Sequence, residues 1–225
     1  INYDYRSSNI YIDIEYIQNT YSNAVSCKGS SLKSQSSANV SINKIINCNQ
    51  LRSDTNALII ASGHDCFNLK VGSIVRGEYN IDAHVLFCVD INHIQISLSS
   101  VDNYHHVVRV GNKCNSINVV GGRYYHVSSM IVLTALVESL LKIKVKDLEY
   151  VSGNLDSVVH NLKKDDTPID SLIIANCYLA KSGYKGFTYY RGPLNVRNIN
   201  IYDNVSPKGY RPNILLMNKQ SVMSL

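Results

Sequence analysis

Two pairs of acidic residues are the clearest candidates for chemistry in this sequence. Asp65 and Asp90 form one pair, and Glu78 and Asp102 form the other. Glycoside hydrolysis uses two carboxyl groups about 5 to 9.5 Å apart, one as the acid and the other as nucleophile or base. Either pair could serve if the fold brings its members together. Aspartates are also common in solvated turns, so a purely structural role for Asp65 and Asp90 stays open.

Basic and aromatic residues accompany the second acid pair, and they suggest sugar binding. Tyrosine rings offer flat apolar faces to sugars, and arginine forks bind carboxylates. The residues concerned are Arg76, Arg123, Tyr104, His105, Tyr124 and Tyr125. The same residues also fit β-elimination from a uronic acid, in which an arginine neutralises the carboxylate and Tyr124 or His105 takes the proton. An ordinary loop surface or a subunit contact is the third interpretation.

A repeated sequence unit indicates what positions these residues. The unit is a polar residue followed by apolar, any and apolar residues, and it recurs every 23 to 30 residues, within the range of solenoid repeats. We call its first apolar residue the anchor. The eight units are residues 9–12, 39–42, 68–71, 93–96, 116–119, 142–145, 171–174 and 198–201. A second apolar stretch follows each unit, at residues 24–25, 57–61, 84–89, 107–110, 130–133, 157–160, 186–190 and 213–217.

Stacking the units produces columns of similar residues. Two residues past the anchors lie Ile12, Ile42, Val71, Ile96, Val119, Val145, Ile174 and Ile201, all of them β-branched. Three residues before the anchors lie Ser7, Ser37, Cys66, Ile91, Cys114, Leu140, Ile169 and Val196, which are apolar from the third unit onward. Such columns indicate parallel strands that pair about 4.8 Å apart, joined by right-handed crossovers. We therefore expect an all-β, right-handed parallel β-helix (solenoid) of about eight coils. One domain covers residues 1–225, and because it begins with Ile1 we expect it to be a fragment of a longer chain.

This register makes predictions about particular residues. Asp65 and Asp90 both lie four residues before their anchors, so they should be about one coil apart. Glu78 and Asp102 should lie on the loop side of adjacent coils. Asparagine tolerates left-handed backbone, so we expect coil corners at Asn9, Asn39, Asn68 and Asn198. The run 130–151 could also form a short helix, although Ile143 and Val145 fit the strand register better.

The cysteines and the composition exclude several classes of protein. The six cysteines are Cys27, Cys48, Cys66, Cys88, Cys114 and Cys177. The register puts Cys66 and Cys114 two coils apart, about 10 Å, which is too far for a disulfide. We expect buried free thiols and therefore folding in a reducing cytoplasm. No CxxC pair or other metal cluster is visible, so we expect no metal, and no P-loop is visible, so we expect no cofactor. The net charge of +5 is spread along the chain, and no long apolar run or signal peptide is visible, so neither nucleic-acid binding nor membrane insertion is expected.

The stacked units, with an anchor that often follows asparagine, resemble the pectin-lyase-like right-handed β-helices. Within that group the chain is most similar to the tailspike depolymerases of bacteriophages. The similarity is architectural and covers nearly the whole chain. It implies a homotrimer on the virion tail that acts outside the cell, and that binds and depolymerises a bacterial surface polysaccharide such as an O-antigen or a capsule. We favour glycoside hydrolysis over β-elimination. A fold does not determine a function, so a non-catalytic adhesin or structural spike segment and a polysaccharide lyase of the same fold remain alternatives.

Overall fold

The computed structural model describes residues 2–4, 9–29, 36–48, 57–77, 80–134, 141–153, 157–161, 167–179, 188–190 and 194–205. Consecutive long strands alternate between two sheets, and all the recorded strand pairings are parallel. The first sheet contains β1 (Asn2–Asp4), β3 (Val25–Lys28), β5 (Ala57–Ser62), β7 (Asn80–Val89), β9 (Tyr104–Gly111), β12 (Ser129–Leu133), β15 (Ser157–Asn161) and β17 (Thr188–Tyr190).

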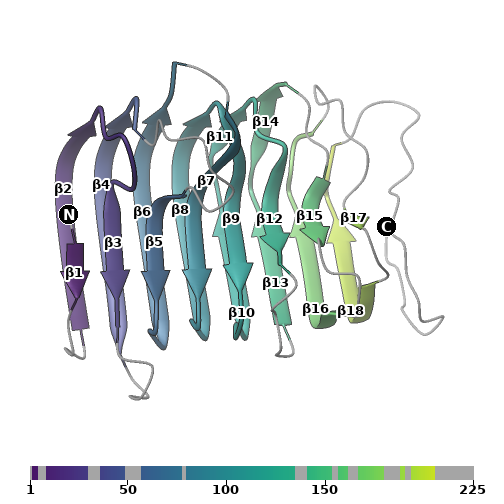
Figure 1. Ribbon diagram of the computed structural model, residues 1–225. Coiled ribbons are helices and arrows are strands. Elements are labelled where there is room, and N and C mark those ends of the chain that lie inside the picture. The colour runs from purple at the N-terminus through teal and green to yellow at the C-terminus, as the bar shows by residue number, and fades with distance from the viewer. Residues whose placement is uncertain are drawn as a thin grey trace.

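The second sheet lies opposite the first (Figure 1). It contains β2 (Asn9–Gln18), β4 (Ser37–Ile46), β6 (Cys66–Val75), β8 (His93–Asp102), β10 (Ser116–Val120), β13 (Leu141–Lys146), β16 (Thr167–Ala175) and β18 (Leu194–Tyr202). Two short strands, β11 (Arg123–Tyr125) and β14 (Glu149–Ser152), pair with each other, and β11 also pairs with the end of β8. The chain is therefore a parallel β-solenoid, as the repeat predicted. Its handedness and the expected number of coils stay predictions.

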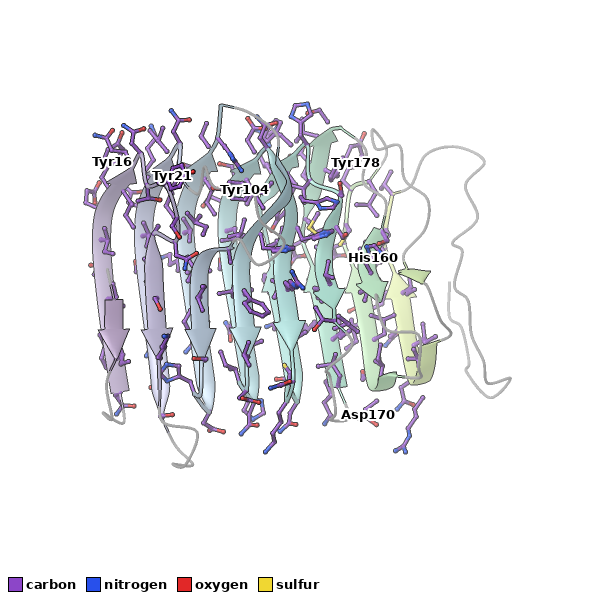
Figure 2. The ribbon with its side chains drawn as sticks, viewed as in Figure 1. Tyr16, Tyr21, Tyr104, His160, Asp170 and Tyr178 are labelled. Atoms are coloured by element: carbon purple, nitrogen blue, oxygen red, sulfur yellow. The ribbon has the colours of Figure 1, made fainter. Side chains whose placement is uncertain are left out.

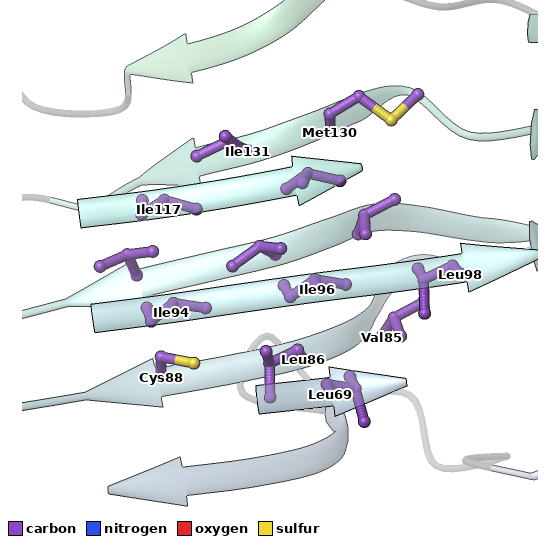
Figure 3. Close-up of a cluster of buried hydrophobic side chains, with 14 of the residues drawn as sticks. Leu69, Val85, Leu86, Cys88, Ile94, Ile96, Leu98, Ile117, Met130 and Ile131 are labelled. Carbon is purple, nitrogen blue, oxygen red and sulfur yellow. The ribbon is translucent and has the colours of Figure 1, made fainter. Parts of the chain in front are cut away.

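The alternation of apolar and polar residues explains why these segments are strands with one buried side. In β13, Leu141, Ile143 and Val145 are buried, whereas Lys142 between them is exposed. The buried side chains of the two sheets meet in one core (Figure 3), where Ile94 and Ile96 of β8 face the layer that contains Leu86 of β7. This core excludes water along the solenoid and provides most of the driving force for folding.

The register between strands agrees with the prediction in five of seven pairings and differs in two. In β2–β4, Ile12 lies opposite Val40, and in β6–β8, Leu69 lies opposite Ile96. Both differences are shifts of two residues relative to the aligned anchors. Because strand side chains alternate with a period of two, such a shift keeps the anchors and the β-branched residues two positions past them inside. The interior columns therefore survive the shift, but outward residues acquire different neighbours.

The corners of the solenoid lie at other residues than expected. Asn9, Asn39, Asn68 and Asn198 lie within β2, β4, β6 and β18. The left-handed backbone occurs instead after the strands, at Asn19, Asn47, Asp90, Asn103, Asn112, His126, Asp147, Asn176 and Asp203, and at several glycines. The choice of residue type was therefore right, since asparagine and aspartate tolerate this conformation, but the positions were wrong.

The cysteine and helix predictions have clear outcomes. All six cysteines are free, as expected. Cys66 is only partly buried and pairs with His93, so the interior column that was to contain Cys66, Ile91 and Cys114 begins at Ile91. Residues 130–133 and 141–146 form β12 and β13, so the strand interpretation of this region is confirmed where the structure describes it. No helix in the described residues is long and apolar enough to cross a membrane.

Candidate functional site

The first predicted acid pair does not meet. The backbone nitrogen of His93 bonds to the carbonyl of Asp65, so Asp65 lies beside Asn92, and the Asn92 side-chain amide donates to its carboxylate at 2.8 Å. Asp90 is exposed at a corner with a φ of 54°, beside Gly63. The two-residue register shift between β6 and β8 is the physical reason. Glu78, of the second pair, lies outside the described residues. Its pairing with Asp102 therefore stays a prediction.

Three residues of the predicted sugar-binding patch are buried. The rings of Tyr104 and Tyr124 are fully buried, and their hydroxyls donate to the carbonyls of Cys48 at 3.1 Å and Gly121 at 2.9 Å. Burial raises the pKa of both phenols. Arg76 is also buried, with its guanidinium carbon 5.9 Å from the centre of the Tyr104 ring. The expectation that these residues contact a sugar is therefore corrected, because their side chains are buried.

The other residues of the patch lie at or near the surface. Arg123 among them, and the neighbouring Asp102, already have charged or polar partners within the chain. Arg123 donates to Glu149 through Nε at 2.8 Å and Nη2 at 3.4 Å, which makes a bidentate exposed ion pair. Asp102 lies 3.1 Å from Nδ1 of His126 and pairs in register with the partly exposed Tyr125. The remaining residue, His105, is partly exposed, and its ring stacks on His106 with 3.8 Å between ring centres.

A groove of about 510 Å³ lies elsewhere, on the outer side of the second sheet. It crosses four neighbouring strands, β2, β4, β6 and β8. Its lining consists of Tyr11, Ile12, Asp13, Asn39, Val40, Ser41, Asn68, Leu69, Lys70, Gln95 and Ser97. The polar members of this set belong to outward positions of the strands, so they face solvent and can reach a ligand.

The outer side of this sheet carries three columns of stacked residues that include the groove. Twelve of their 24 positions are Asn, Gln or Ser. The first column is Asn9, Ser37, Cys66, His93, Ser116, Lys142, Ser171 and Asn198; the second is Tyr11, Asn39, Asn68, Gln95, Asn118, Lys144, Ile173 and Asn200; the third is Asp13, Ser41, Lys70, Ser97, Val120, Lys146, Ala175 and Tyr202. We call this surface the polar face. Its amides and hydroxyls both donate and accept hydrogen bonds, as sugar hydroxyls require of a partner.

Direct contacts already exist along the polar face. Ser37 donates to Asn9 at 2.7 Å, and Asn68 donates to Asn39 at 2.8 Å. Beside these amides, Tyr11 is 78% exposed, so its ring is free of the core and open to an apolar ligand face. An exposed aromatic ring beside a row of amides is an arrangement that can bind a carbohydrate.

Two carboxylates that the sequence analysis overlooked lie at this groove. Asp13 lines it, and Glu15 is the next outward residue on the same strand. Both are exposed, and the Asn43 amide donates to Glu15 at 2.6 Å. Two residues along a strand span about 6.6 Å, within the separation that glycosidases use. The alternation from Tyr11 to Glu15 is the signal in the sequence that indicates this pair, whereas both acid pairs predicted from the repeat join different coils.

A cluster of histidines is buried on the first sheet, away from the groove. His84 and His106 are buried, and their rings stack 5.1 Å apart. Ser129 Oγ lies 2.9 Å from Nδ1 of His106, and Arg109 Nη1 lies 3.3 Å from Nε2 of His84. Burial, together with the neighbouring positive charges of His105, His84, His160 and Arg109, holds the pKa of His106 well below its usual value of 6.5. His84 and His106 are enclosed in the fold, so we assign them to its stability.

This cluster predicts a loss of stability in mild acid. Unfolded chains bind a proton at each histidine near pH 6.5, whereas folded His106 stays neutral. The free energy of unfolding should therefore fall by about 1.4 kcal/mol per pH unit for such a residue as the pH drops below 6.5, until its folded pKa is reached. Urea unfolding at pH 7.5, 6.5 and 5.5 measures this slope. His106→Gln should reduce the slope, whereas the exposed His93→Gln should not; equal slopes in wild type and His106→Gln would contradict the prediction.

No protein-family model, curated protein or solved structure matches the chain. The structure itself therefore defines the class of protein, which is a parallel β-solenoid with a grooved, amide-rich outer sheet surface.

Proposed function

We propose that this protein binds a polysaccharide in the groove across β2, β4, β6 and β8. The observation that carries the proposal is the groove lining, in which the exposed ring of Tyr11 stands beside the amides of Asn39, Asn68 and Gln95. A sugar ring can stack on the tyrosine while its hydroxyls exchange hydrogen bonds with the amides. Because the columns continue from strand to strand, a polymer can repeat these contacts along the solenoid.

We further propose that the bound polysaccharide is hydrolysed, with Asp13 and Glu15 as the carboxylate pair. One carboxyl group would protonate the leaving oxygen, and the other would attack the sugar or activate water. The Asn43 amide donates a hydrogen bond to Glu15 and so orients this carboxylate for the second role. Glycosidic bond breakage by this route needs no metal or cofactor.

The biological setting that we propose is a homotrimeric phage tailspike on the virion, which acts on a bacterial O-antigen or capsule. The similarity of the repeated units to tailspike β-helices supports this setting. Six free cysteines agree with folding in a reducing cytoplasm before assembly. Glycan binding without cleavage would favour the adhesin alternative, and products that carry an unsaturated uronic acid would favour the lyase.

The binding proposal makes a direct prediction for Tyr11. Tyr11→Ala should weaken binding to the recognised glycan by about 2- to 10-fold, because aromatic stacking contributes about 0.5 to 1.5 kcal/mol. Tyr21→Ala is the matched control, since Tyr21 is 68% exposed and does not line the groove. A panel of O-antigens and capsular polysaccharides identifies the ligand, and titration calorimetry then measures both affinities. If no glycan binds, or if both variants lose affinity equally, the groove is not the binding site.

A further inference from the structure

Three lysines occupy every outward position of β13. Its sequence alternates strictly, so Lys142, Lys144 and Lys146 face outward while the apolar residues are buried. Consecutive lysines on this strand are separated by about 6.6 Å along the backbone. They belong to the polar face, one in each of its three columns. Only one strand, β10, separates β13 from β8, so the lysines lie about 10 Å from the last strand of the groove.

The neighbours of these lysines leave the strand with unbalanced positive charge. Lys142 has a loose contact of 3.9 Å with Asp170, which lies at one edge of the solenoid (Figure 2). Lys146 donates to the hydroxyl of Tyr202 at 2.9 Å and also interacts with the carboxylate of Asp147, the next residue in the chain, so two acidic residues accompany the three lysines. In register, Lys144 lies between Asn118 and Ile173, and within the described part of the chain it has no ion-pair partner.

The columns of the polar face connect these lysines to the groove. In the second column Gln95, which lines the groove, is followed by Asn118 of β10 and then by Lys144 of β13. The column therefore leads from the amides of the groove to the ammonium groups of β13.

We propose that Lys142, Lys144 and Lys146 form an anion-binding subsite for the same polysaccharide, whose ligand is therefore an acidic glycan. This inference rests on the proposed function. Neutral sugar units occupy the groove on β2 to β8, and acid groups of the polymer bind the lysines of β13. The polymer runs across the strands, parallel to the solenoid axis, because the three columns run in that direction.

The test compares two triple variants with equal loss of charge. One is Lys142→Gln/Lys144→Gln/Lys146→Gln. The control is Lys28→Gln/Lys44→Gln/Lys113→Gln, which removes three exposed lysines that lie outside β13 and do not line the groove. Affinity is measured by titration of the acidic glycan, of its carboxyl-reduced neutral form and of heparin, in sodium chloride from 50 to 500 mM.

The β13 variant should bind the acidic glycan about 10-fold more weakly at low salt, and its affinity should depend less on salt than that of wild type. Both variants and wild type should bind the carboxyl-reduced form alike. Equal affinity of both variants for the acidic glycan would overturn the subsite while the proposed function stands. Binding of heparin as tight as binding of the glycan, with the same dependence on β13, would overturn it as a nonspecific polyanion surface. Absence of any glycan binding by wild type would refute the proposed function itself.

Discussion

Asp13→Asn and Glu15→Gln should each reduce the release of reducing ends from the bound polysaccharide by about 100-fold or more. General acid–base and nucleophilic roles contribute about 10²- to 10⁴-fold in rate, and an amide can fill neither role. Binding should be largely retained in both variants, because the Tyr11 ring and the amides of the groove remain. Reducing-end release and calorimetric affinity, measured on the same glycan, separate the loss of chemistry from the loss of binding.

Asp90→Asn is the matched control for the acid pair. Asp90 is exposed at a corner, and asparagine tolerates its left-handed backbone equally well, so stability and activity should be unchanged. Glu78→Gln and Asp102→Asn test the acid pair predicted from the sequence. If these two variants lose activity while Asp13→Asn and Glu15→Gln retain it, the reaction does not occur in the groove. Products that absorb as unsaturated uronic acids would show that the glycan is cleaved by β-elimination and not by hydrolysis.

Ile96→Ala should lower the free energy of unfolding by about 2 to 5 kcal/mol. Ile96 is fully buried in β8, where it stacks in register between Leu69 and Val119. Truncation leaves a cavity between the two sheets that rigid strands cannot close, and the lost transfer energy adds to the cavity term. The midpoint of urea unfolding, followed by circular dichroism, measures the change.

Ser99→Ala on the same strand controls for the Ile96 substitution. Ser99 is exposed and points away from the core, so its replacement should change stability by less than about 0.5 kcal/mol. A small effect of Ile96→Ala, similar to that of Ser99→Ala, would mean that β8 is not packed against the first sheet. The described packing of the two sheets against each other would then be wrong at the centre of the core.

The strand pattern of this protein was predictable from its sequence. β-Branched residues two positions past each anchor, such as Ile96 and Val145, indicated parallel strands with a shared interior, and these residues are buried. The second apolar stretch of each repeat also coincides with strands of the first sheet where the structure describes it. Local alternation is enough for this result, because hydrophobic burial requires only that one side of each strand be apolar.

The candidate site was not predictable in the same way. Tyr104 directly follows the left-handed Asn103, and Tyr124 comes two residues after the left-handed Gly122, so each ring comes just after a corner where the chain changes direction. Both rings point into the core, and no local sequence pattern predicts this orientation. Asp13 and Glu15 were overlooked although they share one strand. Their candidate role depends on the groove, which four strands form together.

The sequence by itself therefore determined which residues form strands and which side of each strand is buried. Only the tertiary structure decided which outward residues are neighbours. Aligned anchors would put Asp65 near Asp90, but the two-residue shift between β6 and β8 puts it beside Asn92 instead. A shift of two costs nothing in burial, because side chains alternate with a period of two. The register is set instead by corners and side-chain packing over the whole solenoid, which a single repeat does not encode.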